Sequence, residues 1–491
     1  MAKVTLISPH DPSWDFGLRT LSSVLKKEGH KIRLLFIPLS AGQRAIDNDN
    51  LRQIVDLSSD SDLIGMSVMT NFFSGMVVIT KALRNELNIP IIWGGIHPTI
   101  RPDECLNHAD IVCLGEGEVP LVNLVKNLEE SHGYGKILGL GLRINDRVVI
   151  NDQNPSIKDL DVLPFPDYEC EDDYVLQKGS VRKIDKKLLE EILSGFTHTS
   201  KEKYTIYHTI TSRGCSFACS YCCNSYLKKT HFDGKIVRKR SVGNIINELA
   251  TIKQKLPLVD CILINDDDFF IRSEDEMALF AKEYRERIGL PLWITGLHIL
   301  KFSNKKFSLL VDAGLKFIRL GLQTGSDRTR EMYHRNYSNK QVISVAKDIN
   351  KFRHKIAAPS YDIILDNPWE SDDDLVKTLM LISRLPKPYG IELFSLTLYP
   401  GTELYERAKR EGMIKDDIEE VYDRDYYGVK PTYLNGLFRF ISVCSREGWF
   451  FSPPVIFMLT NPILRRLKIS YFIYFLLKIN IFPRRRREYN T

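Results

Sequence analysis

The sequence predicts an α/β protein that combines a doubly wound, Rossmann-like domain, a partial (β/α)6 barrel and a mainly helical C-terminal region. Two observations predict this fold class. Short apolar runs alternate with helical patterns over roughly the first 130 residues, and the alternation resumes near residue 204 with six strand-and-helix repeats. The length of 491 residues also exceeds what one hydrophobic core usually holds, so several domains are expected.

The first unit, residues 1–150, is expected to contain a parallel sheet. Its predicted strands and helices span residues 4–7, 32–36, 63–68, 91–93 and 111–114, and residues 17–28, 74–86 and 119–128, respectively. Two further runs, 137–144 and 147–151, flank Asn145 and Asp146 and predict a β-hairpin. Ligands of such sheets bind at the carboxyl ends of the strands, so the loops there are candidate binding loops.

Two glycine-containing loops follow strand ends in this unit: GGIHPT at 94–99 and GEGE at 115–118. Glycine lets the backbone approach a ligand closely, and the start of a helix offers amide groups to polar atoms. Ordinary tight turns explain either loop equally well. Both interpretations therefore remain open at this point.

Residues 151–203 are expected to form a linker, because DLDVLPFPDYE at 159–169 is rich in proline and turn residues. The barrel is expected at 204–410 and the helical, basic and aromatic region at 411–491. Predicted barrel strands span residues 207–211, 261–265, 292–295, 317–321, 358–365 and 392–398. Chemistry in such barrels takes place at the carboxyl ends of the strands.

The positive charge of the chain is local. Of the net charge of +6, the last 31 residues carry +7 and the other 460 residues −1, which argues against a nucleic-acid-binding surface on the fold. No secretory signal is visible, so a cytoplasmic location is expected. The apolar run at 469–482 is too short to span a bilayer. With the arginines at 484–487 it could lie on an anionic membrane surface, or form a helix packed on the barrel.

Four of the nine cysteines lie between positions 215 and 223, in RGCSFACSYCCNSY. Disulfides do not suit a reducing cytosol, and zinc sites usually need a second, separate cysteine pair, which the chain lacks. The CxxxCxxC spacing of Cys215, Cys219 and Cys222 instead lets one loop hold three corners of an iron–sulfur cluster. Such clusters usually have four thiolate ligands, so one iron would stay open. Cys223 is expected to be a small buried residue.

The three cysteines resemble the signature of the radical S-adenosylmethionine (radical SAM) superfamily. NDDDFF (265–270), LGLQTGSD (320–327), DIILDNPWES (362–371) and LTLYPGTEL (396–404) resemble further segments of that family, in the same order. The resemblance implies a 4Fe-4S cluster on the three cysteines, with S-adenosylmethionine chelating the open iron through its amino and carboxylate groups. It also implies S-adenosylmethionine contacts from Tyr221, Asp267, Gln323 and Ser326. Gln323 replaces the usual Glu, which leaves an amide without a charge.

The front unit, with GGIHPT, GEGE and LPFPDY, resembles the cobalamin-binding domain of many radical SAM enzymes. The DxHxxG motif that supplies a histidine to cobalt in other cobalamin proteins is absent. The implied cobalamin contacts are Ser67, Gly94, Gly95, Thr99, Gly115 and Glu116. His97 is expected to be a buried, hydrogen-bonded loop histidine. The loop with His10, Trp14 and Phe16 could face the corrin ring or simply cap the next helix.

The resemblance implies a cobalamin-dependent radical SAM enzyme that methylates an unactivated carbon. The alternatives are a cyclase or rearrangement enzyme of the anaerobic magnesium-protoporphyrin ester cyclase type, and an inactive cobalamin-binding regulator. The departures at Gln323 and Asp366 favour the regulator. The expected partners are a small-molecule substrate, for which the tail suggests hydrophobic character, and an electron donor such as flavodoxin or ferredoxin, with no nucleic acid.

Overall fold

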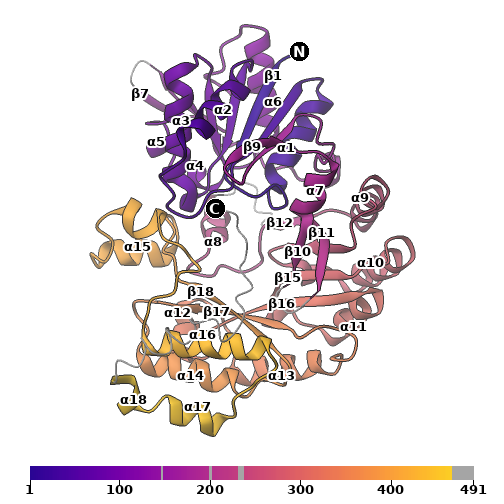
Figure 1. Ribbon diagram of the computed structural model, residues 1–491, viewed down its shortest axis with the longest axis vertical. Coiled ribbons are helices and arrows are strands. Elements are labelled where there is room, and N and C mark those ends of the chain that lie inside the picture. Colours follow the sequence, from indigo (N-terminus) through magenta and orange to yellow (C-terminus); the bar gives the residue numbers. More distant parts are fainter. Residues whose placement is uncertain (145–146, 198–201, 231–236, 467–491) are drawn as a thin grey trace.

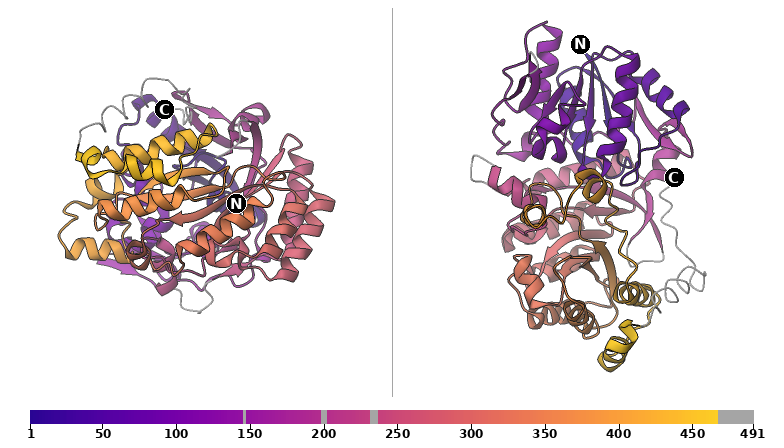
Figure 2. Two further views of the ribbon diagram at one scale, coloured as in Figure 1. Left: turned by 90° about the horizontal axis from the view of Figure 1, so that it is seen from below. Right: turned by 90° about the vertical axis from the view of Figure 1, so that its left-hand side faces the viewer.

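The computed structural model describes residues 1–144, 147–197, 202–230 and 237–466, which form two large sheets placed one above the other (Figure 1). The side view in Figure 2 shows the same arrangement, with the last described helices, residues 453–466, at the end of the barrel far from the first sheet. The predicted fold class is confirmed: a doubly wound domain is followed by a half-barrel and a helical C-terminal region.

The first sheet has nine strands in the order β7-β6-β5-β4-β3-β1-β2-β8-β9. Its parallel centre consists of β1 (Lys3–Ser8), β2 (Lys31–Phe36), β3 (Leu63–Ser67), β4 (Ile91–Gly94) and β5 (Ile111–Cys113), all of which the sequence predicted. The chain places β2 and β3 on opposite sides of β1, so the order reverses there. Ligands of open parallel sheets bind at such a reversal.

Helices cover both faces of this sheet. The helices α1 (Phe16–Lys27) and α6 (Glu118–Glu129) contact each other and bury apolar side chains on one face, while α2 (Asn48–Ser58) and α3 (Phe73–Glu86) do so on the other. The sequence predictions included α1, α3 and α6 but missed α2. Asp47 caps that helix by accepting a hydrogen bond from the amide of Asp49.

The first sheet continues past residue 150. The predicted hairpin is present as β6 (Leu140–Ile144) and β7 (Arg147–Ile150), which pair antiparallel, while its turn at 145–146 lies outside the described residues. The segment 151–203, expected as a linker, contains β8 (Asp173–Gln177) and β9 (Ser180–Lys183). β8 pairs parallel to β2, so this segment supplies one edge of the first sheet.

The second sheet has seven strands in the order β10-β11-β14-β15-β16-β17-β18. Six of them run parallel and match the six predicted barrel strands: β11 (Lys203–Thr209), β14 (Cys261–Ile264), β15 (Leu292–His298), β16 (Leu315–Gln323), β17 (Ser360–Leu365) and β18 (Gly390–Ser395). The edge strand β10 (Ser194–Phe196) is antiparallel to β11. The helices α9 (Val242–Lys255), α10 (Glu274–Arg287), α11 (Asn304–Ala313), α13 (Asn339–Asn350) and α14 (Asp372–Ile382) follow successive strands.

The C-terminal region is helical, with α15 (Glu403–Arg410), α16 (Tyr433–Arg446), α17 (Pro453–Leu459) and α18 (Pro462–Arg466). Between α15 and α16 the chain contacts the first domain, where the Tyr422 hydroxyl donates to Glu104 over 2.9 Å. The apolar run at 469–482 and the arginines at 484–487 lie outside the described residues. Among the helices that are described, none combines the length and apolarity needed to cross a membrane.

Candidate cofactor site between the two sheets

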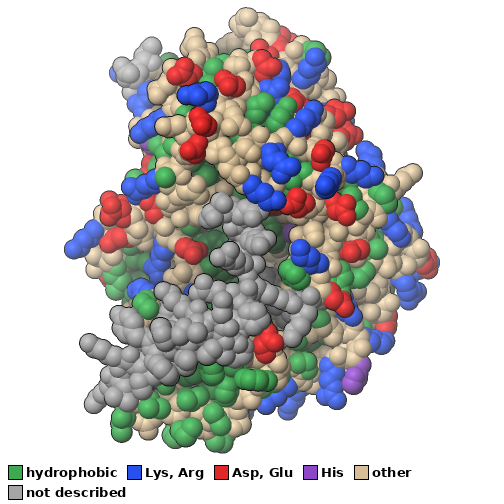
Figure 3. Space-filling model, viewed as in Figure 1, with side chains coloured by type: hydrophobic (Ala, Val, Ile, Leu, Met, Phe, Trp, Pro, Cys, Tyr) green, Lys and Arg blue, Asp and Glu red, His purple; other side chains and the backbone are tan. Residues whose placement is uncertain are grey.

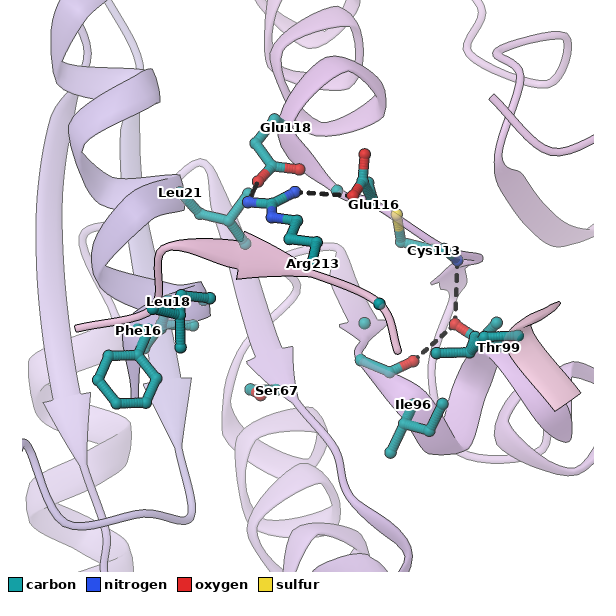
Figure 4. A pocket seen from close by; sticks show the side chains of 18 of the residues that line it. Phe16, Leu18, Leu21, Ser67, Ile96, Thr99, Cys113, Glu116, Glu118 and Arg213 are labelled. Atoms are coloured by element: carbon teal, nitrogen blue, oxygen red, sulfur yellow. Dashed lines mark hydrogen bonds and ion pairs between the residues drawn. The ribbon is translucent and has the colours of Figure 1, made fainter. Parts of the chain in front are cut away.

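A cavity of about 530 Å³ lies between the carboxyl ends of the two sheets. All six residues predicted to contact cobalamin line it: Ser67, Gly94, Gly95, Thr99, Gly115 and Glu116. Apolar side chains, among them Phe16, Leu18, Leu21 and Ile96, form much of its wall (Figure 4). The second sheet contributes the start of the cysteine loop, including Cys215, and Asp267 after β14. The cavity therefore joins the two predicted cofactor sites.

The glycine loops form one corner of this cavity. Gly95 has φ of +104°, and a Cβ there would lie 3.0 Å from the carbonyl oxygen of Val68. Thr99 donates its hydroxyl to the carbonyl of Gly95 over 2.7 Å and accepts the amide of Gly115 over 3.0 Å. Thr99 thus links the two loops by hydrogen bonds at the wall of the cavity (Figure 4). A side chain at Gly95 would strain the backbone and press against the backbone of Val68, directly after β3, which explains the glycine.

Glu116 has its carboxylate in a group of four charged side chains rather than free toward the cavity. Arg213 bonds it over 2.9 Å, and Arg238 bonds its two oxygens over 2.7 and 2.9 Å. Arg213 also contacts Glu118, so it lies between two carboxylates (Figure 4). Burial opposes the charge on Glu116, but the two arginines outweigh burial and lower its pKa to about 2. A cobalamin contact from Glu116 remains a prediction.

The cysteine loop begins after β12 (Ser212–Arg213). Cys219 is 8% exposed, and the amide of Cys222 closes a turn on the carbonyl of Cys219 over 3.0 Å. Burial raises the pKa of Cys215 to about 12, and binding to iron would reverse this because a coordinating thiol loses its proton. Cys223 is the first residue of α8 (Cys223–Thr230).

The arrangement of the cysteine loop is compatible with a cluster that binds each cysteine through its own iron. Within the described residues, no three His, Cys, Asp or Glu side chains converge as the ligands of one metal ion would. A cuboidal cluster binds each cysteine through a different iron, so its ligands lie further apart. Assignment of the three cysteines as cluster ligands remains a prediction that this arrangement permits.

Within the described residues, four buried polar atoms at or shortly after the ends of β14, β15, β16 and β18 lack hydrogen-bond partners. They are Asp268 Oδ1, His298 Nε2, Gln323 Oε1 and Thr397 Oγ1. Because buried polar groups are normally satisfied, these four atoms favour a polar ligand at this end of the half-barrel. Sequence reasoning predicted Gln323 as a contact, and the segments 265–270 and 396–404 that it singled out contain Asp268 and Thr397, so only His298 was missed. The position of His298 at the end of β15 was the signal that could have found it.

The structure separates the four predicted S-adenosylmethionine contacts. Asp267 lines the cavity, and burial raises its pKa although a hydrogen bond with Asn224 opposes the rise. Tyr221 and Gln323 both lie near Arg335. Ser326 donates its hydroxyl to Asp374 over 2.7 Å and caps α12 (Asp327–Met332), so it already has an internal role.

Arg335, which sequence reasoning missed, is 6% exposed and lies beside the cysteine loop. Its guanidinium donates to the Tyr221 hydroxyl over 2.9 Å and to the Gly321 carbonyl over 2.8 Å, and it lies 3.6 Å from Cys219 Sγ. Within the described residues it forms no ion pair with a carboxylate. A buried cation without an anionic partner is costly, so Arg335 fits a site that receives an anionic ligand.

The two histidines of the front domain that sequence reasoning considered, His97 and His10, both contact neighbouring side chains. His97 is fully buried, and its Nδ1 lies 3.1 Å from the Thr70 hydroxyl, which confirms a buried, hydrogen-bonded histidine. His10 contacts Met69 over 3.0 Å. Of the loop residues His10, Trp14 and Phe16, Phe16 lines the cavity.

Comparisons with known proteins agree with this arrangement. The family model of the B12 binding domain matches residues 2–125, and that of the radical SAM superfamily matches residues 209–382. The chain is therefore an enzyme of the radical SAM type that carries a B12-binding domain in front of its barrel.

Several proteins to which the chain is similar are named as methyltransferases. The chain is 23% identical to an uncharacterized methyltransferase of Pyrococcus horikoshii, over 80% of this chain and 78% of the relative. It is also 23% identical to the cytidylyl-2-hydroxyethylphosphonate methyltransferase of Streptomyces wedmorensis, over 86% and 84%. The fold is similar to that of the radical S-adenosylmethionine methyltransferase TsrM from Kitasatospora setae, with a TM-score of 0.64, 16% identity, and coverage of 94% and 90%.

Proposed function

We propose that this protein is a cobalamin-dependent radical SAM methyltransferase that methylates an unactivated carbon of a small molecule. The observation that carries the proposal is the cavity lined both by the glycine loops of the B12-binding domain and by the start of the cysteine loop. A methyl donor held by the first domain and a radical source held by the second would thus act on one substrate between them.

The residues that line the cavity support an assignment of side chains to each group. Ser67, Gly94, Gly95, Thr99 and Gly115 would accommodate the corrin, and Cys215, Cys219 and Cys222 would hold the cluster. Arg335 and Gln323 would receive the polar end of S-adenosylmethionine. Within the described residues, the Arg335 guanidinium has no carboxylate partner and Gln323 Oε1 has no hydrogen-bond partner. When bound, the cluster supplies one-electron reductive cleavage of S-adenosylmethionine, and cobalamin supplies a transferable methyl group.

The chain itself positions the reactants and excludes water. The apolar wall formed by Phe16, Leu18 and Leu21 would shield a reactive intermediate from solvent. A one-electron donor such as flavodoxin or ferredoxin would deliver the electron, and the reaction would take place in the cytoplasm.

The test is product counting with anaerobically reconstituted protein and a chemical reductant. Methyl transfer predicts deoxyadenosine, methionine and S-adenosylhomocysteine in the presence of substrate, and a cyclase would not form the last of these. Reduced protein loaded with its cluster that yields neither deoxyadenosine nor S-adenosylhomocysteine would refute the proposal and favour a regulator. Candidate substrates can be screened by mass spectrometry for a gain of one methylene unit.

We also propose peripheral contact with an anionic membrane through the C-terminal region. Phe457 and Met458 of α17 and Ile463 of α18 are 72%, 61% and 70% exposed. Figure 3 shows hydrophobic side chains gathered at the lower end of the molecule, where Figure 1 places α17 and α18. Exposed apolar side chains next to a basic sequence favour adsorption to anionic lipid.

Flotation of the full chain with phosphatidylserine-containing vesicles tests this contact, with phosphatidylcholine vesicles for comparison. Replacing Phe457 and Met458 by Ser should reduce flotation several-fold, whereas Leu279→Ser, at a half-exposed position of α10, should leave it unchanged. Equal flotation of both variants, or none for the unaltered chain, would contradict membrane contact.

A further inference from the structure

The four charged side chains Glu116, Glu118, Arg213 and Arg238 join the B12-binding domain to the cysteine loop. The glutamates belong to the segment between β5 and the first turn of α6, and the arginines belong to the two-stranded ladder of β12 and β13 (Arg238–Lys239). Their side chains are between 5% and 21% exposed, so water screens these ion pairs little.

Arg213 is placed to transmit displacement from one domain to the other. Only Gly214 separates it from Cys215, and both of these residues line the cavity together with Glu116 and Glu118. Any ligand that moves the glutamate loop must therefore either move Arg213 or break a buried ion pair.

The opposite side of β12 is fixed to the barrel. Asp266, after β14, accepts the amide of Ser212 over 3.2 Å and its hydroxyl over 2.8 Å. Asp266 is itself paired with the buried Arg272 over 3.3 Å. The start of the cysteine loop thus contacts Glu116 and Glu118 of the first domain and Asp266 of the barrel. Its position therefore depends on both domains.

We propose that this charged group couples the two cofactor sites, so that a corrinoid in the cavity and a cluster on the cysteine loop each bind more tightly when the other is present. The coupling rests on the proposed function, because it requires that both groups bind. Arg213 and Glu118 carry it as positioning residues. Coupling between binding sites is reciprocal, so the same factor must appear in both affinities.

Two measurements test the coupling without relying on turnover. One is the affinity of hydroxocobalamin for the full chain with and without its cluster, from spectral titration under anaerobic conditions. The other is the rate at which a chelator removes iron, with and without hydroxocobalamin. For the unaltered protein we expect the cluster to tighten hydroxocobalamin binding about tenfold, within the usual range for coupled sites, and hydroxocobalamin to slow the loss of iron.

The variants separate coupling from loss of structure. Arg213→Gln leaves Glu118 without the ion-pair partner that the described residues give it, whereas the double variant Arg213→Gln/Glu118→Gln removes both charges and relieves that strain. We expect the double variant to bind hydroxocobalamin and iron, yet to show equal affinity and equal iron loss with and without the other group. Lys239→Gln, which removes a 2.8 Å ion pair from β13 to Glu276 within the barrel unit, should keep the full effect.

Each outcome decides the proposal. Coupling that persists in the double variant, or that is absent in the unaltered protein loaded with both groups, would overturn it. If the double variant fails to bind one group, Arg213→Gln alone, which also breaks both ion pairs of Arg213, serves as the second variant, and persistence of coupling there has the same meaning. An unaltered chain that binds iron or hydroxocobalamin but not both would instead overturn the proposed function.

Discussion

Replacing Glu116 by Gln should lower the free energy of unfolding by about 3 kcal/mol at pH 7. The pKa of this carboxyl falls from 4.5 to about 2 in the folded chain, because bonds to Arg238 and Arg213 outweigh the effect of burial. A fall of about 2.5 in pKa, at about 1.36 kcal/mol for each, corresponds to about 3 kcal/mol. Breaking a buried ion pair by removing one partner costs a similar amount, about 3–5 kcal/mol.

The pH dependence has a definite sign. Because the folded pKa lies below the unfolded one, the stabilisation is complete above pH 4.5 and is lost as the pH falls toward about 2. The difference in stability between the unaltered protein and Glu116→Gln should therefore be constant from about pH 5 upward and shrink below pH 4.5.

Urea unfolding at several pH values, followed by circular dichroism, measures this difference. Glu190→Gln, at an exposed position of α7 (Lys186–Leu193), is the matched control and should change stability by less than about 0.5 kcal/mol. A difference below about 1 kcal/mol for Glu116→Gln at pH 7, or one that persists unchanged at pH 3, would refute the reasoning.

Three further predictions concern the sites and the loop between them. Alanine at any of the three predicted cluster cysteines should abolish iron binding and deoxyadenosine formation, while Cys223→Ala should largely retain both; iron and sulfide analysis with product assays checks this. Gly95→Ala should weaken hydroxocobalamin binding at least tenfold and destabilise the chain by about 1–3 kcal/mol, because φ is +104° there; spectral titration and thermal unfolding measure the two effects. Asp266→Ala should cost about 3–5 kcal/mol, since it leaves the buried Arg272 unpaired, and normal stability in urea would contradict that estimate.

Much of the fold could be predicted because each central strand is a short apolar run followed by a helical pattern. The five parallel strands of the first sheet and the six of the half-barrel all match such runs. The hairpin of β8 and β9 could not be found this way. Its strands, DYVLQ and SVRK, are short and have polar ends, and β8 pairs with β2, which is distant in sequence. α2 was missed for a related reason, since its sequence NDNLRQIVDLS is mostly polar.

The candidate site also has residues that local sequence patterns predict and residues that only tertiary contacts reveal. Local spacing predicted the cysteines, and the two glycine loops were found at strand ends because that is where parallel sheets bind ligands. The ion pairs of Glu116 join residues about 100 positions apart, and no local pattern reports such contacts. Arg335 likewise becomes notable only when folding buries it beside Cys219 without a carboxylate. The departure at Asp366 is also explained by tertiary contacts, because its carboxylate accepts from Ser395 and from Asn435 of α16, each over 2.7 Å.

The return of the chain to the first sheet through β8 and β9 has a consequence for synthesis on the ribosome. A nascent chain that ends near residue 150 already contains the central strands, but β2 then has an unpaired edge that could join another chain. The edge is covered only when residues 173–183 have left the exit tunnel, and by then the ribosome has already made the first barrel strand, β11. Completion of the front domain is therefore delayed into the synthesis of the barrel, and a pause in translation near residue 150 should promote aggregation.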